Sequence, residues 1–327
     1  MNSQPTRNLA LELVRVTEAA ALAAGRYMGR GDKVSADKAA VDAMRLVLNT
    51  VEMDGKVVIG EGGKDEAPML YSGELLGTGS PPQVDIAVDP IDGTRPLSLG
   101  GWNSISTVAL APRGSLFNPG PFVYMNKIAV GPEGRGKIDI NAPVRENLKN
   151  VALSKEKQLK DLTVVILDRP RHNELIAEVR QSGARIRLIP DGDVAGALIT
   201  AWPDSGIDIL MGIGGTPEGV IAACALKAMG GEIQGKLHAR NDEELQRGRE
   251  MGYDFDKVLT INDLVSSDNV FFAATGITDG ELLRGVKYDG KGARTDSLVV
   301  RGMTGTVRRV VAHHRWDKLK RISTFDY

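Results

Sequence analysis

The sequence predicts an α/β protein whose N-terminal half is α+β. After about residue 155, strand-like runs alternate with helical runs, which is typical of a parallel sheet covered on both faces. Before that point, two helical segments precede several strands. Because no low-complexity linker separates them, we expect two tightly packed halves, 1–155 and 156–327.

The N-terminal half opens with two expected helices. Apolar residues recur at helical spacing through 6–29. A second helix is predicted over 35–51, with Ala36, Ala40, Met44 and Leu48 on one face. The strands and the hairpin that we expect in this half are 56–60, 84–88, 102–112 and a strand-turn-strand hairpin at 124–140.

Three strand–helix pairs follow in the C-terminal half, and we expect them to build the parallel sheet. Their ranges are strand 162–168 with helix 172–183, strand 185–190 with helix 193–202, and strand 208–214 with helix 216–231. The tail, 304–321, predicts a strand followed by a basic surface segment.

Composition disfavours several classes of function. The net charge is -1, from 41 basic and 42 acidic residues, and no long run of one sign occurs, so neither nucleic acid nor a membrane surface is an expected partner. Charged residues interrupt every long apolar stretch, so we expect no membrane span and no secretory signal. The only cysteine, Cys224, lies at helical spacing among aliphatic residues, which indicates a core position in a cytoplasmic protein.

Acidic side chains follow the ends of four predicted strands. These residues are Glu61, Asp89, Asp92, Asp191, Asp193 and Glu218. Ligand sites of α/β sheets form beyond the carboxyl ends of strands, so these acids can converge in one crevice. Carboxylates without matching histidines or cysteines favour hard cations such as Mg²⁺ or Mn²⁺.

Each acidic stretch, taken alone, also fits a purely structural role. Asp-Pro-Ile-Asp-Gly is good turn chemistry, because proline presets φ and glycine accepts a positive φ. Asp193 fits a helix N-cap. Thr216 fits an N-cap with Pro217 at the first helical position, where the helix dipole alone would favour Glu218.

Arg169 and Arg171 flank Pro170 at a strand end, immediately before a predicted helix. Two guanidinium groups beside a helix N-terminus suit a phosphate group. An exposed charged turn explains the same stretch equally well.

The ordered motifs resemble those of the class II fructose-1,6-bisphosphatase family, within the superfamily of lithium-sensitive, metal-dependent sugar phosphatases. The stretches that carry the resemblance are GRGDKVSAD, VIGEG, KDEAPMLY, DIAVDPIDGT, YMNKIAVGP, LDRPRH, PDGDVAGA, GIGGTPEG and FFAATGITDG. The resemblance runs from about residue 8 to the C-terminus, so it covers nearly the whole chain.

The resemblance implies a five-layer α-β-α-β-α fold, two or more divalent cations (Mg²⁺ or Mn²⁺) and removal of the 1-phosphate from fructose 1,6-bisphosphate in gluconeogenesis. It further implies a cytoplasmic homo-oligomer, a dimer or a tetramer. The metal ligands that it implies are Asp37, Glu61, Asp89, Asp92 and Glu218. The substrate contacts that it implies are Asp92, Gly93, Thr94, Tyr124, Arg169, Pro170, Arg171, Asp191, Gly192, Asp193 and Gly215.

For catalysis, Asp89 and Glu61 are expected to hold the cations that activate a water molecule. Thr94 is expected to hydrogen-bond that water and pass its proton to a neighbouring carboxylate. Asp65 is a weaker candidate for that base.

Two departures from the family pattern bear on the metal positions. Gly63 replaces an acid that the family usually carries, and Lys38 replaces a glycine directly after Asp37. A lysine beside a cation ligand repels the cation unless its side chain points away.

Alternatives remain at this stage. They are a phosphatase that also accepts sedoheptulose 1,7-bisphosphate, an inositol-type monophosphatase, and a sugar-phosphate-binding regulator without turnover. The two arginines favour a bisphosphate, although they do not determine the length of the sugar.

Overall fold

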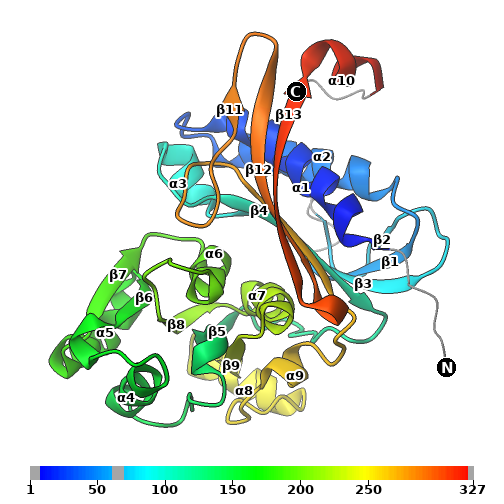
Figure 1. Cartoon of the computed structure of the whole chain (residues 1–327). Helices are drawn as coiled ribbons and strands as arrows, with labels where there is room; N and C mark the ends of the chain where they lie inside the picture. The colour runs from blue at the N-terminus through cyan, green and yellow to red at the C-terminus, as the bar shows by residue number, and fades with distance from the viewer. Residues whose placement is uncertain (1–7, 61–69, 323–327) are drawn as a thin grey trace.

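The computed structural model describes residues 8–60 and 70–322 and has five layers in the order α-β-α-β-α (Figure 1). The predicted α/β class is therefore confirmed. The helices are α1 (Ala10–Ala24), α2 (Lys33–Leu48), α3 (Thr94–Leu99), α4 (Val144–Ser154), α5 (Asn173–Ser182), α6 (Asp193–Leu198), α7 (Thr216–Met229), α8 (Asp242–Glu250), α9 (Ile261–Leu264) and α10 (Trp316–Ile322). The strands are β1 (Asp54–Ile59), β2 (Leu75–Leu76), β3 (Gln83–Asp92), β4 (Ile105–Pro112), β5 (Tyr124–Val130), β6 (Thr163–Leu167), β7 (Arg185–Ile189), β8 (Ile209–Gly215), β9 (Glu232–Leu237), β10 (Phe271–Gly276), β11 (Lys287–Tyr288), β12 (Gly292–Arg301) and β13 (Thr306–Arg315).

The first sheet has the order β11-β12-β10-β4-β3-β1-β2, with β13 paired to β12. Helices α1 and α2 cover one of its faces, because both carry an apolar stripe. The predicted stripe of α2, from Ala36 to Leu48, is fully buried against this face. Asp32 starts the helix by accepting a hydrogen bond from the backbone N–H of Ser35.

The second sheet has the order β7-β6-β8-β5-β9. Strands β6, β7 and β8 are parallel, as the alternating pattern predicts, whereas β5 runs antiparallel to β8 and β9. Apolar residues of α4 and α5 pack on one face of this sheet. Helices α6 and α7 lie on the other face, between the two sheets.

The hairpin predicted over 124–140 is wrong. β5 forms as expected, but β8 and β9 occupy both of its edges, so no edge remains for a local partner. Pro132 begins a short 3₁₀ helix instead, over Pro132–Gly134. Side chains anchor the segment after it: the Gln234 amide bonds Ile138 O and Ile140 N, and the Asn147 amide bonds Asp139 N and Asp139 O.

The sheets do not divide the chain at residue 155. β5 precedes that residue and belongs to the second sheet, while β10, β11, β12 and β13 follow it and return to the first sheet. The predicted tail strand is β13, and the basic segment after it is helix α10. The chain therefore crosses between the sheets twice, which ties the two layers together.

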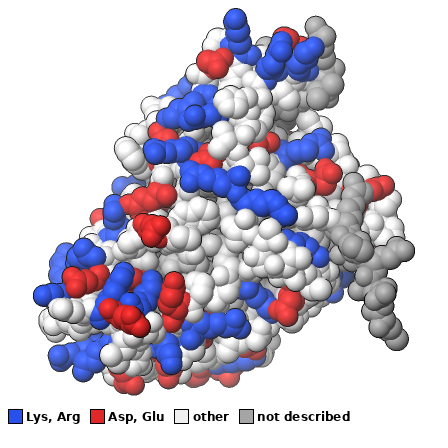
Figure 2. All heavy atoms as spheres, in the orientation of Figure 1, with Lys and Arg blue, Asp and Glu red and all other residues white. Residues whose placement is uncertain are grey.

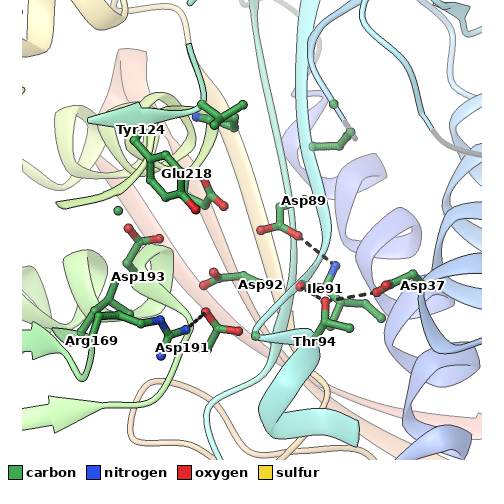
Figure 3. A pocket seen from close by; sticks show the side chains of 18 of the residues that line it. Asp37, Asp89, Ile91, Asp92, Thr94, Tyr124, Arg169, Asp191, Asp193 and Glu218 are labelled. Carbon is green, nitrogen blue, oxygen red and sulfur yellow. Dashed lines mark hydrogen bonds and ion pairs between the residues drawn. The ribbon is translucent and has the colours of Figure 1, made fainter. Parts of the chain in front are cut away.

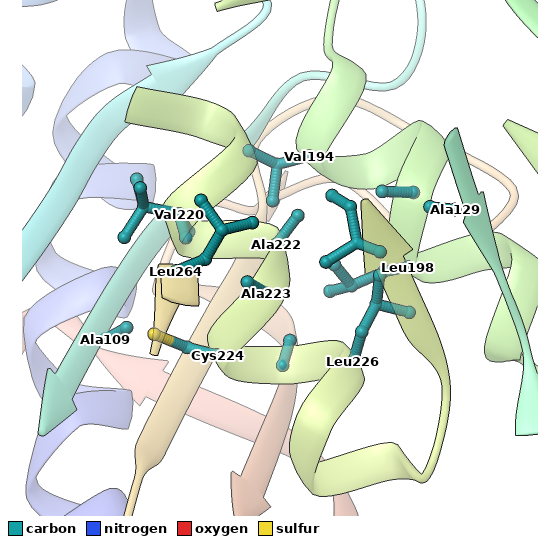
Figure 4. Packing of buried hydrophobic residues seen from close by; sticks show 14 of the residues in the cluster. Ala109, Ala129, Val194, Leu198, Val220, Ala222, Ala223, Cys224, Leu226 and Leu264 are labelled. Atoms are coloured by element: carbon teal, nitrogen blue, oxygen red, sulfur yellow. The ribbon is translucent and has the colours of Figure 1, made fainter. Parts of the chain in front are cut away.

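Helix α7 is apolar on all sides because it fills the space between the sheets (Figure 4). Cys224 lies in this layer with no exposed surface, and burial raises the pKa of its thiol to about 12. The thiol is therefore neutral and belongs to the core, as its spacing in the sequence indicates.

Charges of both signs are interspersed on the face that Figure 2 shows. Among the residues that the structure describes, no helix combines the length and the apolar character needed to cross a membrane.

A polar cluster is buried between α1 and the β12–β13 pair. The Thr295 hydroxyl donates a hydrogen bond of 3.0 Å to Glu18 Oε1, and His314 Nε2 lies 2.8 Å from the same hydroxyl. Burial raises the pKa of Glu18 to about 7, and it outweighs the opposite effects of the Thr295 hydrogen bond and of Arg15. Glu18 is therefore protonated in the folded protein at mildly acidic pH.

Because of Glu18, the free energy of unfolding should fall as the pH rises. Its folded-state pKa of about 7 exceeds the unfolded value of 4.5, so its favourable contribution is complete below pH 4.5 and is lost as the pH rises through about 7. We expect the free energy of unfolding of Glu18→Gln to match that of the wild type near pH 4.5 and to exceed it by about 3 kcal/mol at pH 8. Urea unfolding across this range measures the difference, and a gap that does not change with pH would contradict the assignment.

Candidate active site

A cavity of about 630 Å³ opens between the two sheets and collects side chains from both of them. Its predicted site residues are Asp37, Asp89, Asp92, Gly93, Thr94, Tyr124, Arg169, Arg171, Asp191, Asp193, Gly215 and Glu218. Figure 3 shows Asp89, Asp92, Asp193 and Glu218 turned toward its middle, with Asp37 and Thr94 on one side and Arg169 and Asp191 on the other. Segments far apart in sequence therefore meet at one place.

The stretch from Asp89 to Thr94 is both a tight turn and part of the cavity wall. The pairing of β3 with β4 shifts register between Asp89 and Asp92, and Asp89 Oδ1 accepts a hydrogen bond of 3.0 Å from Ile91 N. Gly93 has a φ of 97°, which favours glycine, and α3 begins at the next residue. Asp89 and Asp92 are both buried at the cavity, at 9% and 3% exposure.

Thr94 contacts one of the predicted metal ligands directly. Its hydroxyl lies 3.1 Å from Asp37 Oδ1, to which it donates, and 3.2 Å from the carbonyl oxygen of Ile91. Burial raises the pKa of Asp37, and the Thr94 hydrogen bond and the charge of Lys33 act against this rise. Among the described residues, Asp37 is thus the carboxylate to which the Thr94 hydroxyl donates a hydrogen bond.

Lys38 does not point into the site. Its ammonium group donates a hydrogen bond of 2.6 Å to Asp42, one turn further along α2, and its side chain is 57% exposed. The lysine therefore leaves Asp37 facing the cavity. The other departure, Gly63, lies outside the described residues, as do Glu61 and Asp65.

Asp92 joins the first sheet to helix α6. Its Oδ2 accepts a hydrogen bond of 3.1 Å from Ala195 N, at the start of α6. Gly192 is the N-cap of that helix, with a φ of 84°, and Asp193 is its first residue. Asp193 is therefore no N-cap, and its side chain is available to the cavity.

Lys127 contacts Asp193 and Gly215, two residues that line the cavity, and the sequence motifs did not single it out. Its ammonium group is 2.5 Å from Asp193 Oδ2, an ion pair without hydrogen-bond geometry, and it donates to Gly215 O at 2.7 Å. The lysine is 3% exposed. The sequence carries a signal for it, because Lys127 occupies the apolar phase of β5 between Met125 and Ala129.

Glu218 lies in the first turn of α7. Gly215 is the N-cap and Pro217 the second helical residue, so the predicted N-cap at Thr216 is wrong by one position. A Cβ on Gly215 would come within 1.6 Å of Glu218 Oε2, so a larger residue here would displace this carboxylate from its present position. Oε2 is buried without a hydrogen-bond partner among the described residues.

The buried carboxylates raise one another's pKa. Burial, followed by the charge of Asp193, raises the pKa of Glu218 to about 7, and Lys127 acts in the opposite direction. The same two causes raise the pKa of Asp92 well above its usual value. The protein thus gathers more negative charge here than its own cations compensate.

The chemistry of these side chains fits a divalent cation. They are oxygen donors, and Glu218 Oε2 is buried without a hydrogen-bond partner in the described chain. Within residues 8–60 and 70–322, no three acidic, histidine or cysteine side chains form a closed group that could hold a metal ion. Glu61, the remaining predicted ligand, lies outside these ranges.

The opposite wall carries the arginine pair. Arg169 bonds Asp191 Oδ1 at 3.2 Å and the carbonyl oxygens of Asp168 and Pro190. Arg171 donates twice to Ile213 O, and its guanidinium carbon lies 5.2 Å from the centre of the Tyr124 ring. Both arginines line the cavity rather than an outer turn.

Two predicted contacts, Pro170 and Gly192, are not among the residues that line this cavity. Pro170 begins the 3₁₀ helix that carries Arg171, and Gly192 turns the chain beside Asp92. Both shape the loops that carry lining residues.

The five-layer fold, with carboxylates facing an arginine pair across one cavity, defines a phosphatase of the α-β-α-β-α class. Residues 7–314 match the family described as "Bacterial fructose-1,6-bisphosphatase, glpX-encoded". The chain belongs to this bacterial fructose-1,6-bisphosphatase family.

Curated relatives agree with the family match. The chain is 49% identical over 325 residues to "Fructose-1,6-bisphosphatase 1 class 2" of Escherichia coli strain K12, covering 95% of this chain and 96% of the relative. The identity and both coverages are the same for "Fructose-1,6-bisphosphatase class 2" of Escherichia coli O6:H1 and of Shigella flexneri.

Proposed function

We propose that this enzyme removes the 1-phosphate of fructose 1,6-bisphosphate, giving fructose 6-phosphate and phosphate in gluconeogenesis. The observation that carries the proposal is the meeting of acidic and basic walls in one cavity of about 630 Å³. The acidic wall suits a cation and a reacting phosphate, and the basic wall suits a second phosphate. A bisphosphate would place one phosphate group at each wall.

The reacting phosphate belongs beside Asp89, Asp92 and Glu218. With Asp37 and Glu61, these residues would hold Mg²⁺ or Mn²⁺, which neutralise the phosphate oxygens and lower the pKa of a water molecule when bound. Buried carboxylates suit this role because their mutual repulsion favours a cation over an empty site.

Thr94 and Asp37 would carry the proton. Attack of a water oxygen on phosphorus breaks the bond to the C1 oxygen, which leaves with the electron pair and takes up a proton from solvent water. The attacking water gives its proton to the Thr94 hydroxyl, whose own proton passes to Asp37 Oδ1, 3.1 Å away. No covalent intermediate with the protein is required.

The rest of the cavity would orient the sugar. Arg169 and Arg171 would bind the 6-phosphate, with Arg171 held at Ile213 O and beside Tyr124. Asp191 and Asp193 would accept hydrogen bonds from the sugar hydroxyls. Lys127 would hold the Asp193 carboxylate in place through their ion pair.

We also propose that the enzyme works in the cytoplasm as a homo-oligomer, a dimer or a tetramer. A single, buried cysteine suits a reducing compartment.

Phosphate release from three substrates tests the proposed function. Fructose 1,6-bisphosphate should give the highest kcat/KM, above sedoheptulose 1,7-bisphosphate and inositol 1-phosphate, and only with Mg²⁺ or Mn²⁺ present. Turnover that persists in excess EDTA, or a preference for inositol phosphate, would refute the proposal. Release from none of the three would favour a regulator without turnover.

Thr94→Ala tests the proton path. We expect kcat to fall roughly 100-fold with little change in KM, because a proton-transfer group acts mainly in the transition state. Thr94→Ser retains the hydroxyl and should keep most of the activity. Full kcat in the alanine variant would rule out this role for Thr94.

A further inference from the structure

His172 is a buried histidine that the proposed mechanism does not use. It directly follows Arg171, and its side chain is 1% exposed. Its Nδ1 donates a hydrogen bond of 2.7 Å to Leu167 O, and its Nε2 accepts one of 2.7 Å from Ile213 N. Only the neutral ring with its proton on Nδ1 satisfies both partners.

The imidazole ring of His172 connects β6 and β8 where their backbone pairing has ended. The pairing of β6 with β8 covers Val164 with Ile209 and Val165 with Leu210, and it ends there. Two residues further on, the imidazole spans from the end of β6 to Ile213 of β8. His172 therefore holds these two strand ends together at the cavity edge.

Strand β8 is shaped to admit the ring. Gly212 has a φ of 125°, and a Cβ at this position would lie 2.9 Å from His172 Nε2. A side chain here would be strained and would also press on the ring. The glycine and the histidine thus form one packing unit.

Ile213 links this unit to the arginine pair. Its N–H donates to His172, while its carbonyl oxygen accepts two hydrogen bonds from Arg171, from Nη2 at 2.8 Å and from Nε at 3.1 Å. A shift of Ile213 therefore moves the acceptor that orients the Arg171 guanidinium group.

We propose that His172 is a positioning residue that holds Arg171 in place for the non-reacting phosphate of the substrate. The inference rests on the proposed function, because it presumes that the arginine pair binds that phosphate. Burial, Arg171 and Arg169 all lower the pKa of His172, so the ring stays neutral and Nε2 keeps its lone pair near neutral pH.

The two hydrogen bonds can be removed separately. In His172→Asn the amide can replace Nδ1 but cannot reach Ile213, whereas in His172→Gln the amide oxygen can replace Nε2. His172→Phe keeps a ring and removes both bonds, so it serves if the asparagine variant does not fold. His313→Asn, at an exposed histidine on β13, is the matched control.

Each variant is assayed with fructose 1,6-bisphosphate and with fructose 1-phosphate, which lacks the second phosphate. We expect His172→Asn and His172→Phe to raise KM for the bisphosphate roughly 10-fold, the size of effect when a hydrogen bond to a charged group is lost. Their kcat, and both constants for fructose 1-phosphate, should stay within about 3-fold of the wild type. His172→Gln and His313→Asn should behave like the wild type.

A purely structural role gives a different result. If both substrates lose activity in proportion, or if KM for the bisphosphate does not change in the asparagine and phenylalanine variants, the positioning role is refuted. If the wild-type enzyme itself does not prefer the bisphosphate, the proposed second-phosphate site fails, and the role of His172 fails with it.

Discussion

Repulsion among buried carboxylates is the constraint on which the site depends. Asp92 is buried and Glu218 is partly buried with its Oε2 atom enclosed, and the charge of Asp193 adds to the desolvation that raises the pKa of both. Lys127 is the ammonium group in contact with Asp193, and it offsets only part of this charge. We propose that a bound cation neutralises the remaining negative charge. Relief of the repulsion would then favour binding of the metal and the phosphate.

The arrangement of the five layers brings these charges together. Strand β3 of the first sheet carries Asp89 and Asp92, while helices α6 and α7, between the sheets, carry Asp193 and Glu218. The apolar faces of α7 hold both sheets against it, which fixes the distance across the cavity. Gly215 leaves the space that Glu218 needs.

Much of this arrangement could be predicted from the sequence, because periodicity and strand-end acids are local signals. The apolar stripe of α2 and the parallel strands β6, β7 and β8 follow from such signals. The hairpin prediction failed because a distant segment, β9, pairs with one edge of β5. No local sequence pattern indicates that pairing. The roles of Lys127 and His172 depend on neighbours far along the chain, so their motifs alone did not reveal them. The metal and substrate roles of the acids stay predictions.

Thermal unfolding of the wild type and of Asp92→Asn at pH 8, with and without Mn²⁺, tests whether repulsion among the carboxylates favours metal binding. The asparagine retains an oxygen for Ala195 N but removes one negative charge. We expect Mn²⁺ to raise the wild-type Tm by roughly 5 °C or more, and we expect the variant to have a higher Tm without metal and a much smaller gain in Tm with it. Equal gains in both proteins, or a lower metal-free Tm in the variant, would contradict this proposal.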